Sequence, residues 1–400
     1  MKKMTLLGVS MAVAAGPAFA ADWSFDPKIA VSGEYNDNNR LTEIPGREIK
    51  VSGALLDAQV AMRAETPRSS FDLTPRLRSS FYPGDETEDA DDQFVRMLAR
   101  HSTERTTASL DVDYSRVITL GDYFPTSSVS DDDVLGDPDR GVGVGRIGLR
   151  NREDRLAFTP VVSFKLSPRR SLEFRADYLD VGYDIQIPGD RVDYSDLSGS
   201  IALRNSLSEI SSLTVRAGYS SYDPSDGDSR VANVVDVAWS KDFSETAQTY
   251  VRVGATRVEV GSGVSGGSSS WETGFAGGVG VRWAFEVTEI WVDVSENLDP
   301  NSAGDLVTRD EARVQVARRI GPMTRVYLAG RLILDSSAGG TDSFVDRSYA
   351  TGTLGFEWRF ARQWTLVASY DYAWREYDNA ITDAESNAAS LGIVYQPNRR

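Results

Sequence analysis

The sequence predicts an all-β protein: a transmembrane, antiparallel, up-and-down β-barrel of about 18 strands (16–18) after a cleaved signal peptide. Apolar and polar residues alternate along most of the chain, which is the period of a strand with one apolar face. Short and long connections alternate between these segments, and aromatic residues gather near segment ends. The mature chain has no run of about 18 apolar residues, so a helical membrane protein is not expected.

The N-terminus has the pattern of a secretory signal. Lys2 and Lys3 precede an apolar stretch, and Ala18, Phe19 and Ala20 form a small-residue cleavage site. We therefore expect residues 1–20 to be a signal peptide and residues 21–400 to be one outer-membrane β-barrel domain.

The charge balance is acidic. Loss of Lys2 and Lys3 would take the formal charge from −16 to −18 on the remaining 380 residues, which argues against nucleic-acid binding. The chain contains no cysteine, so disulfides, thiolate metal sites and a lipid-modified N-terminal cysteine are excluded. No cofactor is expected.

Individual segments show the alternation clearly. Phe71, Leu73, Leu77 and Phe81 alternate with polar residues, and the segment from Leu172 to Tyr178 repeats the pattern. The last strand is expected from Ala389 to Tyr395, which would supply a terminal aromatic residue. Each strand should have about 9 to 11 residues, the length of a tilted membrane crossing.

Connections fall into two classes that would lie on opposite sides of a membrane. The short ones, assigned to the periplasm, are Ser167–Arg170, Asn205–Ile210, Asp242–Glu245, Glu286–Glu289 and Ala361–Gln363. The long polar ones, assigned to the cell surface, are Asn36–Glu48, Pro83–Asp92, Gly121–Asn151, Ser221–Arg230, Gly261–Ser270, Asn297–Thr308 and Asp335–Arg347. An even strand number places both termini in the periplasm.

Two sets of aromatic residues match the two interfaces of a bilayer. The set beside the short turns is Trp239, Trp283, Phe285, Trp358, Phe360 and Trp364, and the set towards the long loops is Tyr35, Tyr219, Tyr372 and Trp374. A soluble β-sandwich would also alternate, but it has less reason to place tryptophans beside one set of turns.

The first strand, Ile29 to Tyr35, leads into Tyr35-Asn36-Asp37-Asn38-Asn39-Arg40-Leu41. This entry resembles that of the outer-membrane β-barrel porins associated with exopolysaccharide gene clusters, in which a first strand ending in Tyr-x-Asp-Asn commonly follows the signal peptide. The resemblance implies a porin-like channel that supports export of an exopolysaccharide.

Projection of the alternation inwards gives a set of lumen arginines that could guide an anionic solute or an acidic polysaccharide. The set is Arg76, Arg78, Arg175, Arg216, Arg252, Arg282, Arg313, Arg331 and Arg359. In the simpler interpretation, which mixed lumen charge favours, these arginines pair with carboxylates and stiffen a solvated wall. The inward carboxylates would be Asp111, Asp113, Glu173, Asp177, Asp236, Asp293, Glu357 and Asp371.

Other motifs give little support for an enzyme or a metal protein. His101 is the only histidine and is expected at a periplasmic turn, away from the outer leaflet where lipid-modifying barrels act. Gly143 to Gly148 matches G-x-G-x-x-G by letter, but it lies in a loop instead of opening a helix. The acidic clusters around Asp131 and from Asp85 to Asp92 lack calcium-loop spacing and are interpreted as solvated loops, bridged to lipopolysaccharide through divalent ions.

The sequence therefore predicts a non-enzymatic channel in the outer membrane of a Gram-negative cell. The expected partners are outer-membrane lipid and lipopolysaccharide, the barrel-assembly machinery and, for an export role, polysaccharide export proteins. The alternative is a structural or adhesive barrel whose lumen is closed by residues Gly121 to Asn151.

Overall fold

The computed structural model describes residues 21–119, 151–186, 191–227, 229–260, 270–300, 306–337, 346–378 and 382–397. These form one sheet of 18 antiparallel strands, so the predicted fold class and strand number are confirmed. The strands are β1 Asp22–Asn36, β2 Val51–Glu65, β3 Ser69–Phe81, β4 Ala90–Ser102, β5 Thr106–Thr119, β6 Asn151–Ser167, β7 Arg170–Tyr183, β8 Tyr194–Ser206, β9 Ser211–Pro224, β10 Arg230–Ser244, β11 Ala247–Val260, β12 Ser270–Ala284, β13 Thr288–Pro300, β14 Leu306–Gly321, β15 Thr324–Ser337, β16 Arg347–Ala361, β17 Trp364–Tyr377 and β18 Ala384–Tyr395. A single 3₁₀ turn, η2 Glu86–Glu88, lies between β3 and β4.

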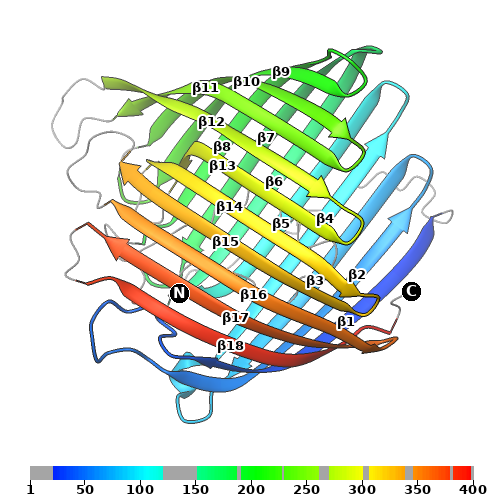
Figure 1. The fold of residues 1–400 in the computed structure, drawn as a ribbon. Coiled ribbons are helices and arrows are strands. Elements are labelled where there is room, and N and C mark those ends of the chain that lie inside the picture. The colour runs from blue at the N-terminus through cyan, green and yellow to red at the C-terminus, as the bar shows by residue number, and fades with distance from the viewer. Residues whose placement is uncertain are drawn as a thin grey trace.

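The sheet closes into a ring because the first strand pairs with the last. Every strand pairs with its neighbours in sequence, and β1 pairs with both β2 and β18. Figure 1 shows the slanted strands following one another around the barrel, with the blue first strand beside the red last one. A closed ring leaves no long free edge, which is the condition for a β-structure to cross a lipid bilayer.

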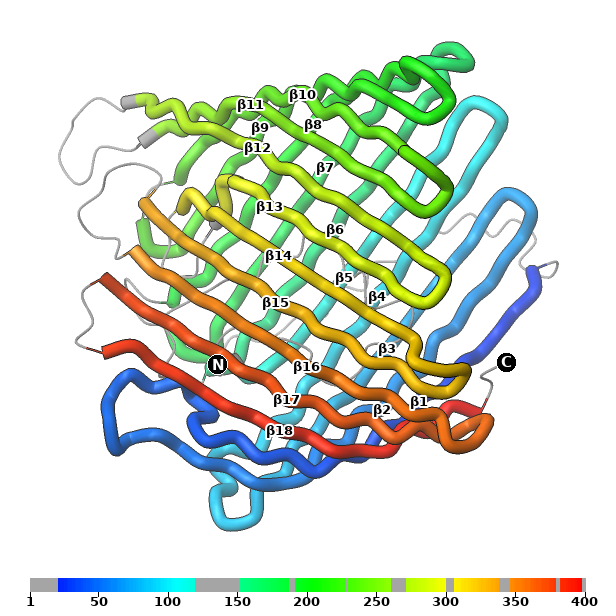
Figure 2. Tube along the Cα trace, viewed as in Figure 1, coloured from blue at the N-terminus to red at the C-terminus, as the bar shows by residue number. Residues whose placement is uncertain are grey.

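The closing seam is shorter than β1 itself. Residues Ile29 to Asn36 pair with Tyr395 to Ala388, whereas Asp22 to Lys28 pair with β2 alone. The first strand was expected to start at Ile29, which is wrong, because β1 starts at Asp22. Ile29 is instead the first residue of β1 that pairs with β18. The first and last strands, β1 and β18, begin and end respectively on the side of the short turns, as the coloured tube in Figure 2 traces.

The outer surface carries the apolar half of the alternation. Leu77, Leu354 and Leu391 are each more than half exposed, and the exposed large apolar residues come from strands all around the ring. Aromatic side chains mark both ends of this surface: Trp358 packs against Phe360 and Trp364 against Tyr395 near the short turns, while Tyr35 and Tyr219 are exposed near the long loops. In the part of the chain that the structure describes, no helix is long and apolar enough to span a membrane.

Two expectations about strand and loop lengths need correction. The strands have 12 to 17 residues instead of 9 to 11, because the hydrogen-bonded ladders continue beyond the apolar belt into the long-loop side. Two further long connections, which follow Tyr183 and Tyr377, were missed for the same reason: their flanks still alternate like strands. Parts of the expected loops Asn297–Thr308 and Asp335–Arg347 also belong to strands.

Gly392 permits close approach of the strands at the seam. It lies opposite Ser32, and a Cβ atom added to Gly392 would lie 2.6 Å from the Ser32 Cβ and 2.8 Å from the Val31 carbonyl oxygen. The second of these neighbours is backbone and cannot rotate away. Gly352 on β16 offers a comparison, because nothing lies within 4 Å of a Cβ added there.

We expect Gly392→Ala to weaken closure of the barrel, at a cost of roughly 1–3 kcal/mol typical of overpacking, whereas Gly352→Ala should have little effect. The measurement is the temperature at which the folded, faster-migrating form is lost on a detergent gel. Equal melting of the two variants would show that the seam tolerates the methyl group.

Candidate functional site

The inner wall of the barrel is polar, and arginines and carboxylates are spread around it. The nine predicted lumen arginines come from eight strands: β3, β7, β9, β11, β12, β14, β15 and β16. On each of these strands, the arginines alternate with exposed apolar residues of the outer face, which places the arginines on the inner one. A ring of this size is too wide for side chains to fill.

Ion pairs hold Arg76, Arg175, Arg216, Arg313 and Arg331. The Arg76 Nε lies 2.9 Å from Asp57, the Arg175 Nη2 lies 2.8 Å from Asp177, and the Arg216 Nε lies 2.7 Å from Asp236. Arg313 and Arg331 face each other on β14 and β15 and share the carboxylate of Glu311. These contacts agree with the simpler interpretation, in which mixed charges stiffen the wall.

The other four have different surroundings. Arg252 donates to the side-chain oxygen of Asn297, and Arg359 donates to the Pro322 carbonyl 3.1 Å away, at the short-turn end. Arg282 is exposed on the inner face of β12, and Arg78 lines a recess described below. The structure therefore distributes the predicted set around the wall, with Arg76 and Arg78 side by side on β3 and Arg313 and Arg331 joined by one carboxylate.

Of the predicted carboxylate partners, Asp177 and Asp236 pair with arginines of the set. Asp111 pairs with Arg96 instead, at 3.0 Å. Asp293 accepts a hydrogen bond from the Tyr250 hydroxyl, and Asp371 accepts from the Thr353 and Ser369 hydroxyls at 2.7 and 2.9 Å.

The most buried ion pairs were not predicted from the sequence. Asp335, which is almost fully buried, is held between Arg309 and Arg347, with the Arg309 Nε 2.7 Å from its carboxylate. All three residues lie at strand ends that were interpreted as loop borders. The signal that could have found them is the continuing alternation from Arg309 through Glu311 to Arg313, since the inner face keeps its register past the apolar belt.

The first long connection, residues 37–50 (loop L1), folds against the inner wall. Its Leu41 is buried in a cluster with Ile333, Tyr349 and Ala384 of β15, β16 and β18. Leu41 has a left-handed backbone, with φ of 45°, which is uncommon for a residue other than glycine. Surrounding contacts hold it there: its carbonyl accepts a hydrogen bond of 2.8 Å from Arg375.

Further contacts anchor L1 to β18. The side-chain Nδ2 of Asn38 donates to the Glu385 carbonyl at 2.8 Å and to the Thr42 carbonyl at 3.1 Å. One side chain therefore fixes both the contact with the wall and the turn of the loop. The interpretation of Asn36–Glu48 as a surface loop is therefore corrected: part of it lines the lumen. Hydrophobic burial of Leu41 supplies the physical reason.

An ion pair holds the other side of L1. Arg40 pairs with Glu88 of the 3₁₀ turn η2, and the Asn39 amide donates to the same carboxylate at 2.9 Å. Glu88 is fully buried and Asp92 nearly so. The interpretation of Asp85 to Asp92 as a solvated acidic loop is thus wrong for these two residues. L1 covers Glu88, and the Ile118 backbone N–H donates a hydrogen bond of 2.9 Å to the Asp92 carboxylate.

A recess of about 230 Å³ opens in the lumen wall beneath L1. It is lined by L1, by the long-loop ends of β1 to β5 and by β16 to β18. Its charged residues are Glu34, Arg78, Asp92 and Asp371. The Tyr82 hydroxyl also faces it and donates to Glu34; burial, and then the Glu34 charge, raise the pKa of Tyr82, so the hydroxyl stays a donor.

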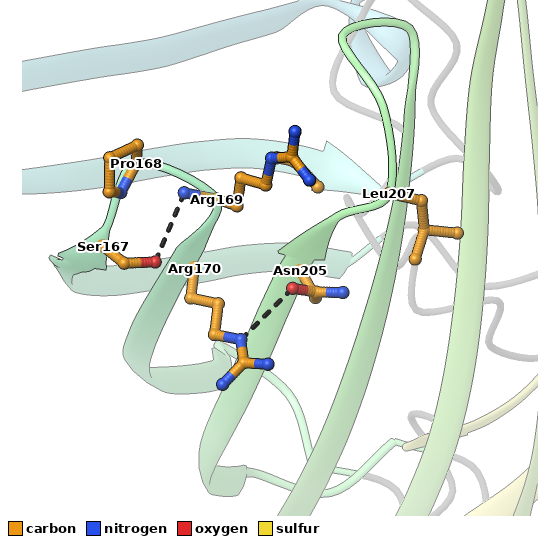
Figure 3. A pocket seen from close by; sticks show the side chains of 7 residues that line it. Ser167, Pro168, Arg169, Arg170, Asn205 and Leu207 are labelled. Carbon is orange, nitrogen blue, oxygen red and sulfur yellow. Dashed lines mark hydrogen bonds between the residues drawn. The ribbon is translucent and has the colours of Figure 1, made fainter.

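A second hollow, of about 540 Å³, lies at the short-turn rim between the β6–β7 and β8–β9 turns (Figure 3). Arg170 donates to the Asn205 side-chain oxygen at 3.4 Å, and the Arg169 amide donates to Ser167 at 3.3 Å. These side chains belong to exposed turns, so the hollow is open surface and we do not assign it a ligand.

The remaining motifs lie near a short turn or outside the described residues. His101 lies beside a short turn, as expected, with its Nδ1 2.9 Å from the Ser69 hydroxyl oxygen on the outward face. Among the described residues, no group of three or more His, Cys, Asp or Glu side chains could hold a metal ion. The Gly143–Gly148 motif, the acidic residues around Asp131 and all but the last residue of the proposed lumen closure Gly121 to Asn151 lie outside the described residues.

No protein-family model matches the sequence, and no curated protein does. Solved barrels are similar in architecture over nearly the whole chain. The glucuronate complex of OccK2 (OpdF) from Pseudomonas aeruginosa is 10% identical with a TM-score of 0.46, covering 94% of this chain and 98% of that one. Acinetobacter baumannii OccAB4 is 9% identical at 0.48, covering 95% and 99%. The outer membrane protein opdK from P. aeruginosa is 8% identical at 0.45, covering 93% and 98%.

The contact between L1 and η2 leads to a test of how firmly the loop is held. In Glu88→Gln the buried charge opposite Arg40 is lost, at a local cost of roughly 1–3 kcal/mol, so L1 should open about tenfold more often. Trypsin should then cleave the folded barrel faster after Arg40, while Glu86→Gln, an exposed neighbour in the same turn, should leave the rate unchanged. Identical cleavage rates would mean that the ion pair does not hold the loop.

Proposed function

We propose that this protein is an outer-membrane channel that passes small hydrophilic solutes. The observation that carries the proposal is a closed ring of 18 strands whose outer face is apolar and whose inner face is lined by charged and polar side chains. Apolar side chains facing outwards with aromatic residues at both ends match a bilayer, and a polar interior of this width favours water.

The orientation in the membrane follows from the connections. The short turns, the start of β1 and the end of β18 share one side, which we assign to the periplasm. The long connections share the other, which we assign to the cell surface. Solutes would then enter past L1 and the recess. Cleavage of residues 1–20 and contacts with lipopolysaccharide and the assembly machinery remain predictions of the same proposal.

Small solutes are favoured over an acidic polymer for an electrostatic reason. Guidance of a polyanion needs positive charge that faces the solute, but five of the nine predicted arginines have carboxylates within ion-pair distance. Exopolysaccharide export, the partner proteins it would need and anion guidance by the arginines therefore remain predictions. A closed structural barrel is the second candidate, which an absence of conductance would favour.

Reconstitution in a planar lipid bilayer tests the channel directly. The purified mature chain should give stepwise ionic conductance, and the double variant Arg40→Ala/Glu88→Ala should give larger or noisier steps because L1 is released from η2. Glu86→Ala serves as the control for the loss of an acidic residue in the same turn. A folded barrel that never conducts would contradict the proposal.

The shared carboxylate of Glu311 offers a test of anion guidance. In Glu311→Gln two arginines, Arg313 and Arg331, lose their common partner, so the chloride-to-potassium permeability ratio should rise by roughly a factor of two. Glu376→Gln on the outer face should leave it unchanged. The reversal potential in a salt gradient measures the ratio, and a cation-selective wild-type channel would count against guidance by the arginines.

A further inference from the structure

The recess beneath L1 has the composition of a binding site for a hydroxyl-rich solute. Besides its charged residues it presents the hydroxyls of Ser80, Thr351, Thr353, Ser386 and Ser390. The amide side chains of Asn36, Asn38 and Asn39 complete a lining that can both donate and accept hydrogen bonds. Tyr82 and Tyr349 are among the tyrosines that line the recess and add ring surface to it.

These polar groups are held in fixed positions before any solute arrives. The Ser386 hydroxyl donates to the Asn36 side-chain oxygen at 2.9 Å, and the Ser369 and Ser390 hydroxyls lie 2.9 Å apart behind Asp371. Asp371 accepts from Thr353 and Ser369, which leaves part of the acceptor capacity of its carboxylate for a donor in the recess. A preformed set of this kind lowers the entropic cost of binding.

Size and charge then limit the ligand. A volume of about 230 Å³ lies below the roughly 300–1,000 Å³ of pockets for drug-sized ligands, which suits a solute with a single six-membered ring. The lining contains three carboxylates, Glu34, Asp92 and Asp371, and one arginine, Arg78. Hydroxyl donors satisfy carboxylates, whereas a solute carboxylate would meet like charges.

We propose that the recess is a subsite for pyranose-sized, hydroxyl-rich solutes and that it disfavours those with a negative charge. The inference rests on the channel function proposed above, because the solute reaches the recess through the lumen. Selection here differs from guidance by arginines: hydroxyl groups are recognised and anions are held off.

Three sugars of the same ring size separate the recognition of hydroxyl groups from the effect of solute charge: glucose, glucosamine and glucuronate. Binding to the folded barrel in detergent, measured by saturation-transfer NMR, should be detectable for glucose and glucosamine and roughly tenfold weaker for glucuronate. Asp371→Asn, which removes a negative charge and keeps the shape, should narrow the gap between glucuronate and glucose. Equal binding of all three sugars, or preference for glucuronate, would overturn the proposal.

The barrel itself provides a matched control for the site. Thr353 donates to Asp371 from one strand to the next, and Thr159 on β6 donates to Asp177 in the same way at 2.9 Å, eight strands away around the ring. Thr353→Val should weaken glucose binding several-fold, while Thr159→Val should not. Equal effects of the two substitutions would place the binding elsewhere in the lumen and refute the assignment.

Two readouts keep this inference separate from the channel proposal. Block of the ionic current by glucose in a bilayer reports the subsite within an open channel, and NMR binding does not require conductance. A conducting barrel that binds no glucose contradicts the subsite alone. A barrel that binds glucose through Thr353 but never conducts supports the subsite and contradicts the channel.

Discussion

The rest of the structure depends on closure of the backbone hydrogen-bond ring between β1 and β18. Residues 22–28 of β1 have a partner on one side only, and eight residue pairs at the seam join the ends of the sheet. In a lipid environment each unpaired amide or carbonyl would cost several kcal/mol, so an open sheet would be unstable there. Closure also fixes the two faces, because strand geometry sends alternate side chains in opposite directions.

Once the ring is closed, the charges on its inner face need partners. Arginines and carboxylates lie on adjacent strands within reach of each other, as Arg76 and Asp57 do on β3 and β2. The deepest of these groups, Asp335, has two arginines. Pairing of this kind lowers the desolvation cost of a crowded inner wall and weakens the net field that a passing solute experiences.

Loop L1 packs against the inner wall of the barrel at its long-loop end. A single leucine, Leu41, enters an apolar cluster on the wall, while Arg40 next to it pairs with Glu88 from another connection. Because both contacts come from adjacent residues, L1 is held against β15 to β18 on one side and against η2 on the other. The shape of the recess depends on this arrangement, because L1 supplies part of its lining.

The sequence by itself determined the fold class, the number of strands to within two and the aromatic residues at both ends, and it predicted the inward position of the arginines. Each of these follows from a local rule: side chains alternate along a strand, and aromatic residues prefer interfaces. Only the tertiary structure decided the Arg40–Glu88 contact, the burial of Leu41 and the recess. These join residues that are far apart in the chain or lie in loops, where no periodicity constrains the backbone, and packing against the closed wall selects one conformation.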